Sequence, residues 1–162
     1  MSGIINSAGS KSGVIGTTEL DYEEGRWTAT WVVDNGTISA YSTTYNQGFY
    51  IKIGGMCHVW GYNSFGSDSG ESESDALRIG GLPFTSRATG FGQSNNQAGG
   101  LSMFGNGLWG SGGPQTGRIT NSSSEAYLQY ATGSGNHTST LVSDMNESAN
   151  YDQVVFFGQY LI

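Results

Sequence analysis

The sequence predicts an all-β protein, an antiparallel β-sandwich with jelly-roll-like connections. The first reason is composition: 27 of the 162 residues are glycine and only 12% are charged, whereas helices are rich in Glu, Lys and Leu. The second is that apolar and polar residues alternate along several short segments, which is the period of a strand. The third is that Gly, Asn and Ser clusters recur about every ten residues, as loops do in a sandwich.

A single domain is expected at residues 21–162, preceded by an extended arm at residues 1–20. The arm is polar and interrupted by glycines, but it contains two apolar pairs, Ile4-Ile5 and Val14-Ile15. Two interpretations of the arm stay open: a frayed terminus, or anchors that become buried against another subunit. The sequence shows neither a secretory segment nor a run of 18 apolar residues.

The first expected hairpin begins with residues 27–33. Trp27, Ala29, Trp31 and Val33 fall on one side of an extended chain and threonines on the other, which indicates a half-buried strand. Asp34-Asn35-Gly36 then supplies residues that tolerate a tight turn, and residues 37–45 return as a strand.

A second hairpin is expected around Gly54-Gly55. Phe49, Ile51 and Ile53 alternate with polar neighbours before this turn. Residues 56–65 form the return strand, in which Cys57 and Val59 face one way. The side chains expected on its other face are Met56, His58, Trp60 and Tyr62.

Further strands are expected near residues 76–80, 98–104, 115–120 and 125–130. The last segment, residues 153–162, is the most apolar, and both of its faces need cover. It should therefore lie at the centre of the sheet packing or at a subunit interface. One face of this strand is formed by Val154, Phe156 and Tyr160, and the other by Val155, Phe157 and Leu161.

Charge limits the partners that this chain can have. The net charge is −7, with only six Lys and Arg, so neither a nucleic acid nor an anionic membrane is an expected partner. With Cys57 as the single cysteine, no intrachain disulfide can form, and stability must come from packing or oligomerisation.

No catalytic set is evident. His58 sits among aromatic strand positions and His137 in a polar loop, and neither has a nucleophile elbow nearby in sequence. Cleaving a sugar bond would need two carboxylates at a defined separation, which could come from Asp21, Glu23, Glu24 and the run at residues 68–75. We therefore expect a protein without enzymatic activity or cofactor, a glycan-cleaving enzyme being a remote alternative.

The acidic loop at residues 67–75 is a second place where a ligand could bind. Asp68, Glu71, Glu73 and Asp75 could offer oxygen ligands to a hard cation, but their spacing does not match an EF-hand. The expected state is a solvated loop with no metal, and a cation at a symmetry axis is the alternative.

The aromatic stripe Met56, His58, Trp60 and Tyr62 has three possible uses. It is suited to one of two buried sheet faces, to an oligomer contact, or to stacking of sugars. We group these residues with Val154, Phe156 and Tyr160 as the candidate trimer or ligand surface.

Several segments, in the order of the chain, resemble the β-rich surface module of tailed-bacteriophage virion proteins. The most specific one is Asp21-Tyr22-Glu23-Glu24-Gly25, an acidic segment expected to be a turn, which runs directly into the strand that begins with Trp27-Thr28. The others are Ser12-Gly13-Val14-Ile15-Gly16, Tyr50-Ile51-Lys52-Ile53-Gly54, residues 59–62, Ile79-Gly80-Gly81-Leu82-Pro83-Phe84, Tyr127-Leu128-Gln129-Tyr130 and Phe157-Gly158-Gln159-Tyr160-Leu161-Ile162. Arg26 and Ala29 depart from the pattern, and residues 91–113 match no part of it.

The resemblance implies a homotrimer with a β-sandwich head and no catalytic residues. Because no shaft precedes the head in this sequence, we expect a capsid decoration or cement protein on the virion surface, bound to the major capsid protein. Ile4, Ile5, Val14 and Ile15 would be the capsid anchors. The alternative is the receptor-binding head of a tail fibre, in which Trp60, Tyr62 and loops at residues 91–113 and 134–150 contact host surface glycans.

Overall fold

The structure is a computed structural model that describes residues 21–40, 44, 46–88, 97–106, 109, 113–145 and 153–162. The expected arm at residues 1–20 lies outside the described residues. The elements are β1 (Tyr22–Thr28), β2 (Thr30–Val32), β3 (Thr37–Ala40), β4 (Gln47–Ile53), β5 (Met56–Ser69), β6 (Arg78–Gly80), β7 (Gln97–Asn106), β8 (Thr116–Thr120), β9 (Ala126–Ala131), β10 (His137–Ser139), the short 3-10 helix η2 (Val142–Asp144) and β11 (Gln153–Leu161).

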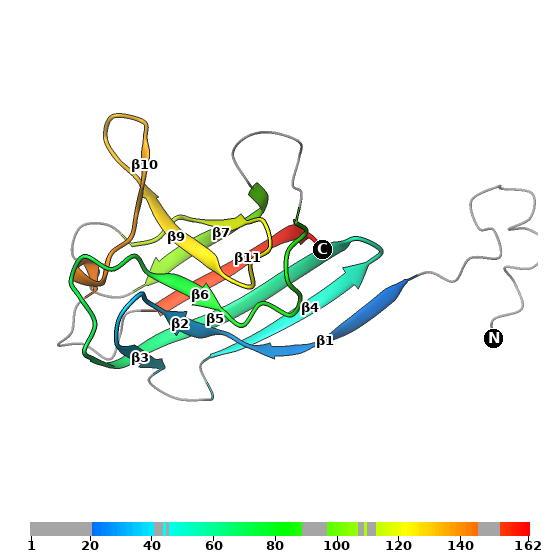
Figure 1. The fold of residues 1–162 in the computed structure, drawn as a ribbon, viewed down its shortest axis with the longest axis horizontal. Coiled ribbons are helices and arrows are strands. Elements are labelled where there is room, and N and C mark those ends of the chain that lie inside the picture. The colour runs from blue at the N-terminus through cyan, green and yellow to red at the C-terminus, as the bar shows by residue number, and fades with distance from the viewer. Residues whose placement is uncertain are drawn as a thin grey trace, which may run out of the picture.

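The strands form one antiparallel sheet in the order β1-β4-β5-β11-β7-β8-β9-β6-β2 (Figure 1). β10 extends from β9, and β3 pairs with the far end of β5. The longest strands, β5, β11 and β7, lie side by side near the middle of this order. The expected all-β, antiparallel class is therefore confirmed.

The two ends of the strand order are neighbours in the chain. β1 lies at one end and β2 at the other, and only Ala29 separates them in sequence. One extended segment thus pairs with β4 along its first half and with β6 along its second half (Figure 1). The sheet consequently bends back until its two ends meet at this segment.

The core lies on the inner side of this bent sheet. The alternation predicted for residues 27–33 is confirmed, because Trp27, Ala29 and Trp31 are buried while the intervening threonines are exposed. In β11 the buried residues are Val154, Phe156 and Tyr160.

Large aromatic rings of the core lie over glycines of the neighbouring strand. Phe156 is paired directly with Gly61, and a Cβ added to that glycine would lie 2.3 Å from the ring. The pairs Trp27 with Gly48 and Tyr50 with Gly25 repeat this arrangement. Several glycines therefore serve as space for an aromatic core rather than as turns.

The second expected hairpin is confirmed and the first is wrong. β4 and β5 pair across Gly54-Gly55, as predicted. The strands on either side of the turn at residues 34–36, however, have different partners: β2 before it pairs with β6, and β3 after it pairs with β5. The turn is held by distant residues: Asn35 binds Asp75, and a Cβ on Gly36 would lie 2.3 Å from the backbone of Glu71. These contacts direct the two strands to different partners.

Two local expectations also need correction. The acidic segment before Trp27 is part of strand β1 rather than a turn. The polar segment after residue 134, expected to be a loop, contains β10, which pairs with β9. Its sequence, His137-Thr138-Ser139, has no apolar side chain, so the period that identifies strands is absent.

Candidate functional site

One face of the sheet carries all of the large apolar side chains that are exposed within the described part of the chain. We call it the outer face: the solvent side of β1, β4, β5, β11 and β7. Its members are Tyr22, Phe49, Ile53, Trp60, Phe104, Val155 and Phe157. The strand pairings place them on the same side, because each is paired directly, or through an intervening residue, with another outer-face position.

An aromatic row crosses the middle of the outer face. Phe49 of β4 is paired with Trp60 of β5, and Trp60 is paired with Phe157 of β11. These three side chains are 50%, 43% and 56% exposed. At the β1 end of the row, the Arg26 guanidinium lies 4.8 Å from the centre of the Phe49 ring, a cation–π contact.

A hollow of about 390 Å³ lies at the β1 end of the outer face. Its lining combines apolar side chains with two opposite charges: Glu24, Gly25, Arg26, Phe49, Tyr50, Ile51 and Trp60. Glu24 accepts a hydrogen bond from the Tyr22 hydroxyl. This hydrogen bond raises the pKa of Tyr22.

The stripe Met56, His58, Trp60 and Tyr62 lies on the outer face, as the alternation predicts. Trp60 is the exposed member, and the other three are partly buried. His58 is paired with Ile51 and Gln159. The sequence therefore identified the face but not how much of each side chain reaches solvent.

The other half of the candidate surface is on the wrong side of β11. The exposed fractions are 0% for Val154, 1% for Phe156 and 1% for Tyr160. A partner subunit or ligand could therefore contact these side chains only if the core opened. Val155 and Phe157 are the exposed apolar residues of this strand. Both faces of β11 are apolar, so the sequence could not indicate which one covers the core.

The expected capsid anchors Ile4, Ile5, Val14 and Ile15 lie outside the described residues. The loop segments at 91–96 and 146–150 do so as well.

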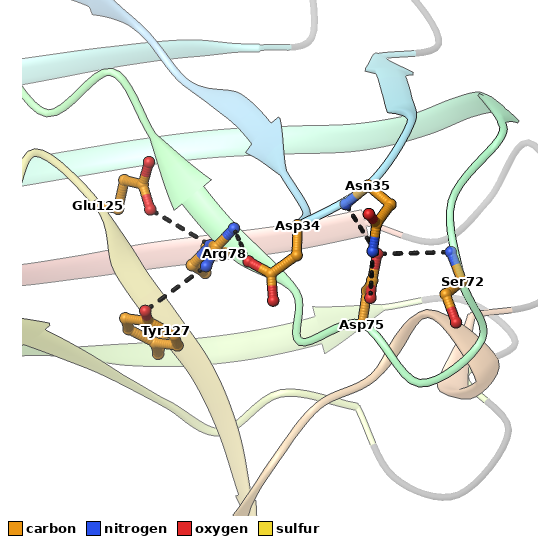
Figure 2. Close-up of polar contacts among 7 residues, drawn as sticks. All are labelled: Asp34, Asn35, Ser72, Asp75, Arg78, Glu125 and Tyr127. Carbon is orange, nitrogen blue, oxygen red and sulfur yellow. Dashed lines mark hydrogen bonds and ion pairs between the residues drawn. The ribbon is translucent and has the colours of Figure 1, made fainter.

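The acidic loop has a structural role at Asp75. Its buried carboxylate accepts hydrogen bonds from the backbone N–H of Asn35 at 3.0 Å, from the Asn35 amide and from the backbone N–H of Ser72 (Figure 2). Glu73 is exposed. Among the residues that the structure describes, no group of three or more His, Cys, Asp or Glu could hold a metal ion.

A second polar cluster joins β2, β6 and β9. The buried Arg78 guanidinium forms ion pairs with Asp34 at 2.7 Å and with Glu125 at 3.2 Å, and it donates a hydrogen bond to the Tyr127 hydroxyl at 3.5 Å (Figure 2). It also lies 5.3 Å from the centre of the Tyr127 ring. Opposite charges and an aromatic face surround this guanidinium, which offsets the cost of its burial. The cluster holds the short strand β6 between its neighbours.

The carboxylates in and immediately before β1 are engaged by separate partners. Asp21 pairs with Lys52 at 2.8 Å and Glu23 accepts a hydrogen bond from Tyr50 at 2.7 Å. The Asp21 contact raises the pKa of Lys52, and the Glu23 contact raises that of Tyr50. Because Glu23 and Glu24 point to opposite faces of β1, they do not flank one substrate position.

The two histidines are remote from each other in the sheet. His58 is in β5 and His137 in β10, and β11, β7, β8 and β9 lie between these strands in the strand order.

Within the described ranges, the structure contains no helix long and apolar enough to cross a membrane.

Comparison of the chain with protein-family models, with curated proteins and with solved structures found no match.

Proposed function

We propose that this protein is a non-enzymatic structural subunit that assembles with copies of itself through its outer face. The observation that carries the proposal is that all of the large exposed apolar side chains in the described ranges gather on that face. A contiguous apolar patch of this kind marks an interaction site.

The size of the patch supports a protein partner. If each of the seven side chains exposes roughly 100 Å², about half of what an aromatic ring can bury, the outer face presents on the order of 700 Å² of apolar surface. The largest patch on an ordinary monomer reaches about 300–600 Å², and a stable interface buries about 800 Å² per partner.

The proposed assembly is a homotrimer of β-sandwich heads on the surface of a tailed bacteriophage. The bend that joins β1 and β2 is the kind of geometry that lets one half of the sheet cover the other. The trimer and the virion location rest on the sequence resemblance described above. A capsid decoration or cement role, with the major capsid protein as partner, suits a surface made for protein contacts.

The assembly is tested by measuring the mass of the full chain in solution by light scattering or sedimentation. The double variant Trp60→Ser/Phe157→Ser should shift a trimer toward monomer, because it removes two rings from the centre of the outer face. Ala131→Ser, an exposed change on β9, is the control and should stay trimeric. A wild-type chain that is monomeric at micromolar concentration would refute the proposal.

The location is tested separately on intact particles. Antibody labelling spread over the capsid would support a decoration protein, and labelling confined to the tail would contradict it. Deleting residues 2–16 should abolish binding to undecorated capsids and leave the trimer intact. If the deleted protein still binds capsids normally, the anchor assignment for Ile4, Ile5, Val14 and Ile15 is wrong.

The hollow favours one alternative function, binding of host surface glycans by a tail-fibre head. Aromatic rings beside Glu24 and Arg26 combine a stacking surface with hydrogen-bonding groups, as sugar sites do. Saccharide binding on a glycan array that is lost in Trp60→Ala, together with no affinity for capsids, would favour this alternative.

A further inference from the structure

We propose that the copies join head to tail, with Phe104 of one copy inserted into the hollow between β1 and β4 of the next. This inference rests on the proposed self-assembly and specifies its contact.

Phe104 projects from the β7 side of the outer face. It is paired with Val155 of β11 and is 66% exposed, the largest value among the apolar residues of this face. An aromatic ring that is this accessible gains by entering an apolar site, because burial removes its surface from water.

The hollow on the β1 side has the size and lining for such a ring. A cavity of about 150 Å³ can hold a benzene molecule, and the hollow has a volume of about 390 Å³. Phe49, Ile51 and Trp60 provide apolar walls. The Arg26 guanidinium already lies over the Phe49 ring, and its opposite face can cover a second ring.

Phe104 cannot fill the hollow of its own copy. β7 and β4 are separated by β5 and β11 in the strand order, which places them roughly 14 Å apart at about 4.8 Å per strand. The two features also face the same side of the sheet. A ring in the hollow must therefore come from another molecule.

A contact between two different patches of the same chain is heterologous, and it can close into a ring. Each copy then contributes one Phe104 and one hollow, and three such contacts complete the proposed homotrimer. The aromatic row between the two patches becomes covered in the same step.

The test is a complementation experiment with two full-length variants. Phe104→Ser removes the inserted ring, and Ile51→Trp fills the hollow. Each variant alone should be mainly monomeric, with the concentration for half-assembly raised roughly tenfold or more, as expected for losing a buried Phe. Their equimolar mixture should form a dimer that grows no further, because only one intact contact can form between the two variants.

Two controls separate this result from misfolding or from added bulk. Phe104→Tyr keeps the ring and should remain trimeric, and Ala131→Trp adds bulk away from the outer face and should also remain trimeric. Circular dichroism should show the same sheet signal for all variants. Trimeric Phe104→Ser, or a mixture that stays monomeric, would overturn the proposal.

Cross-linking supplies a second measurement. In a Cys57→Ala background that keeps Phe104 and Ile51, Ser102→Cys beside the ring with Glu24→Cys beside the hollow should form disulfide-linked species up to trimers. Ala131→Cys with Glu24→Cys, which lacks a cysteine beside the ring, should form far fewer. A bond within one copy is excluded, because a disulfide requires Cα atoms within about 7 Å. A wild-type monomer would refute the assembly itself. A trimer without these cross-links would refute only the Phe104 contact.

Discussion

Glycines opposite aromatic rings set the packing of individual residues in this core. Gly61 faces the Phe156 ring across the β5–β11 pair. The backbone fixes the position of an alanine methyl, so a methyl at residue 61 would overlap that ring. Some of the glycines in this aromatic-rich chain thus have a direct cause in its side-chain packing.

We predict that Gly61→Ala lowers the free energy of unfolding by about 1–3 kcal/mol, the usual cost of overpacking. The matched control is Gly133→Ala, because a Cβ at Gly133 meets no atom within 4 Å. It should stay within about 0.5 kcal/mol of the parent protein. Urea unfolding measures both values, and equal stability of the two variants would contradict the role given to Gly61.

Asp75 is the residue on which the turn at residues 34–36 depends. We predict that Asp75→Asn destabilises the protein by about 1–3 kcal/mol, because one oxygen that accepts N–H groups of Asn35 and Ser72 is replaced by a donor. Glu73→Gln, on an exposed side chain of the same loop, is the control. Thermal unfolding of the two variants should differ, and coincident curves would show that the Asp75 hydrogen bonds are dispensable.

Tyr160 of strand β11 also holds the backbone of the segment around Phe84. The Tyr160 hydroxyl donates to the carbonyl of Phe84 at 3.0 Å and accepts from its backbone N–H at 3.1 Å. We predict that Tyr160→Phe speeds hydrogen exchange of the Phe84 amide and lowers stability by about 1–3 kcal/mol. Tyr130→Phe on β9 is the control, and unchanged exchange at Phe84 in the Tyr160 variant would refute the link.

At the level of elements, the sequence predicted where strands occur better than how they pair. Alternation located β4 and β5, and the turn at Gly54-Gly55 gave the hairpin between them. The partners of β2 and β3 depend on Asp75 and on the backbone near residue 70, which lie far away in the sequence. Local pattern carries no information on such contacts.

For the candidate site as well, the sequence predicted the direction of a side chain but not which strands lie beside one another. The period of two placed Trp60 on an outward face, but the hollow exists only because β1 lies beside β4 and β4 beside β5. The aromatic row also needs β11 next to β5, a pairing between segments that are distant in the chain. Register across such distances is fixed by the assembled sheet and could not be deduced from either strand alone.

For the whole molecule, two buried acidic groups predict loss of stability at alkaline pH. Burial raises the pKa of the Cys57 thiol and of the Tyr160 phenol. Both groups keep their protons to a higher pH in the folded chain than in the unfolded chain, in which they ionise near pH 8.5 and 10. Their contribution is complete below those values and is lost as pH rises above them.

The free energy of unfolding should therefore be flat near pH 7–8 and fall above about pH 9, by up to about 1.4 kcal/mol per pH unit for each group. Denaturant titrations between pH 7 and 11 measure this. Cys57→Ala should remove the part of the decline that begins at the lower pH. A stability that rises across this range would contradict the assignment.

The position of β11 has a consequence for how the chain acquires its structure. This strand is the last of the described elements, yet it lies between β5 and β7 and pairs with both along most of its length. During synthesis, β5 and β7 leave the ribosome with the edges that will face β11 still unpaired, and such edges attract other chains. Completion of the sheet waits for this late insertion between two distant segments, which makes slow folding the expected behaviour.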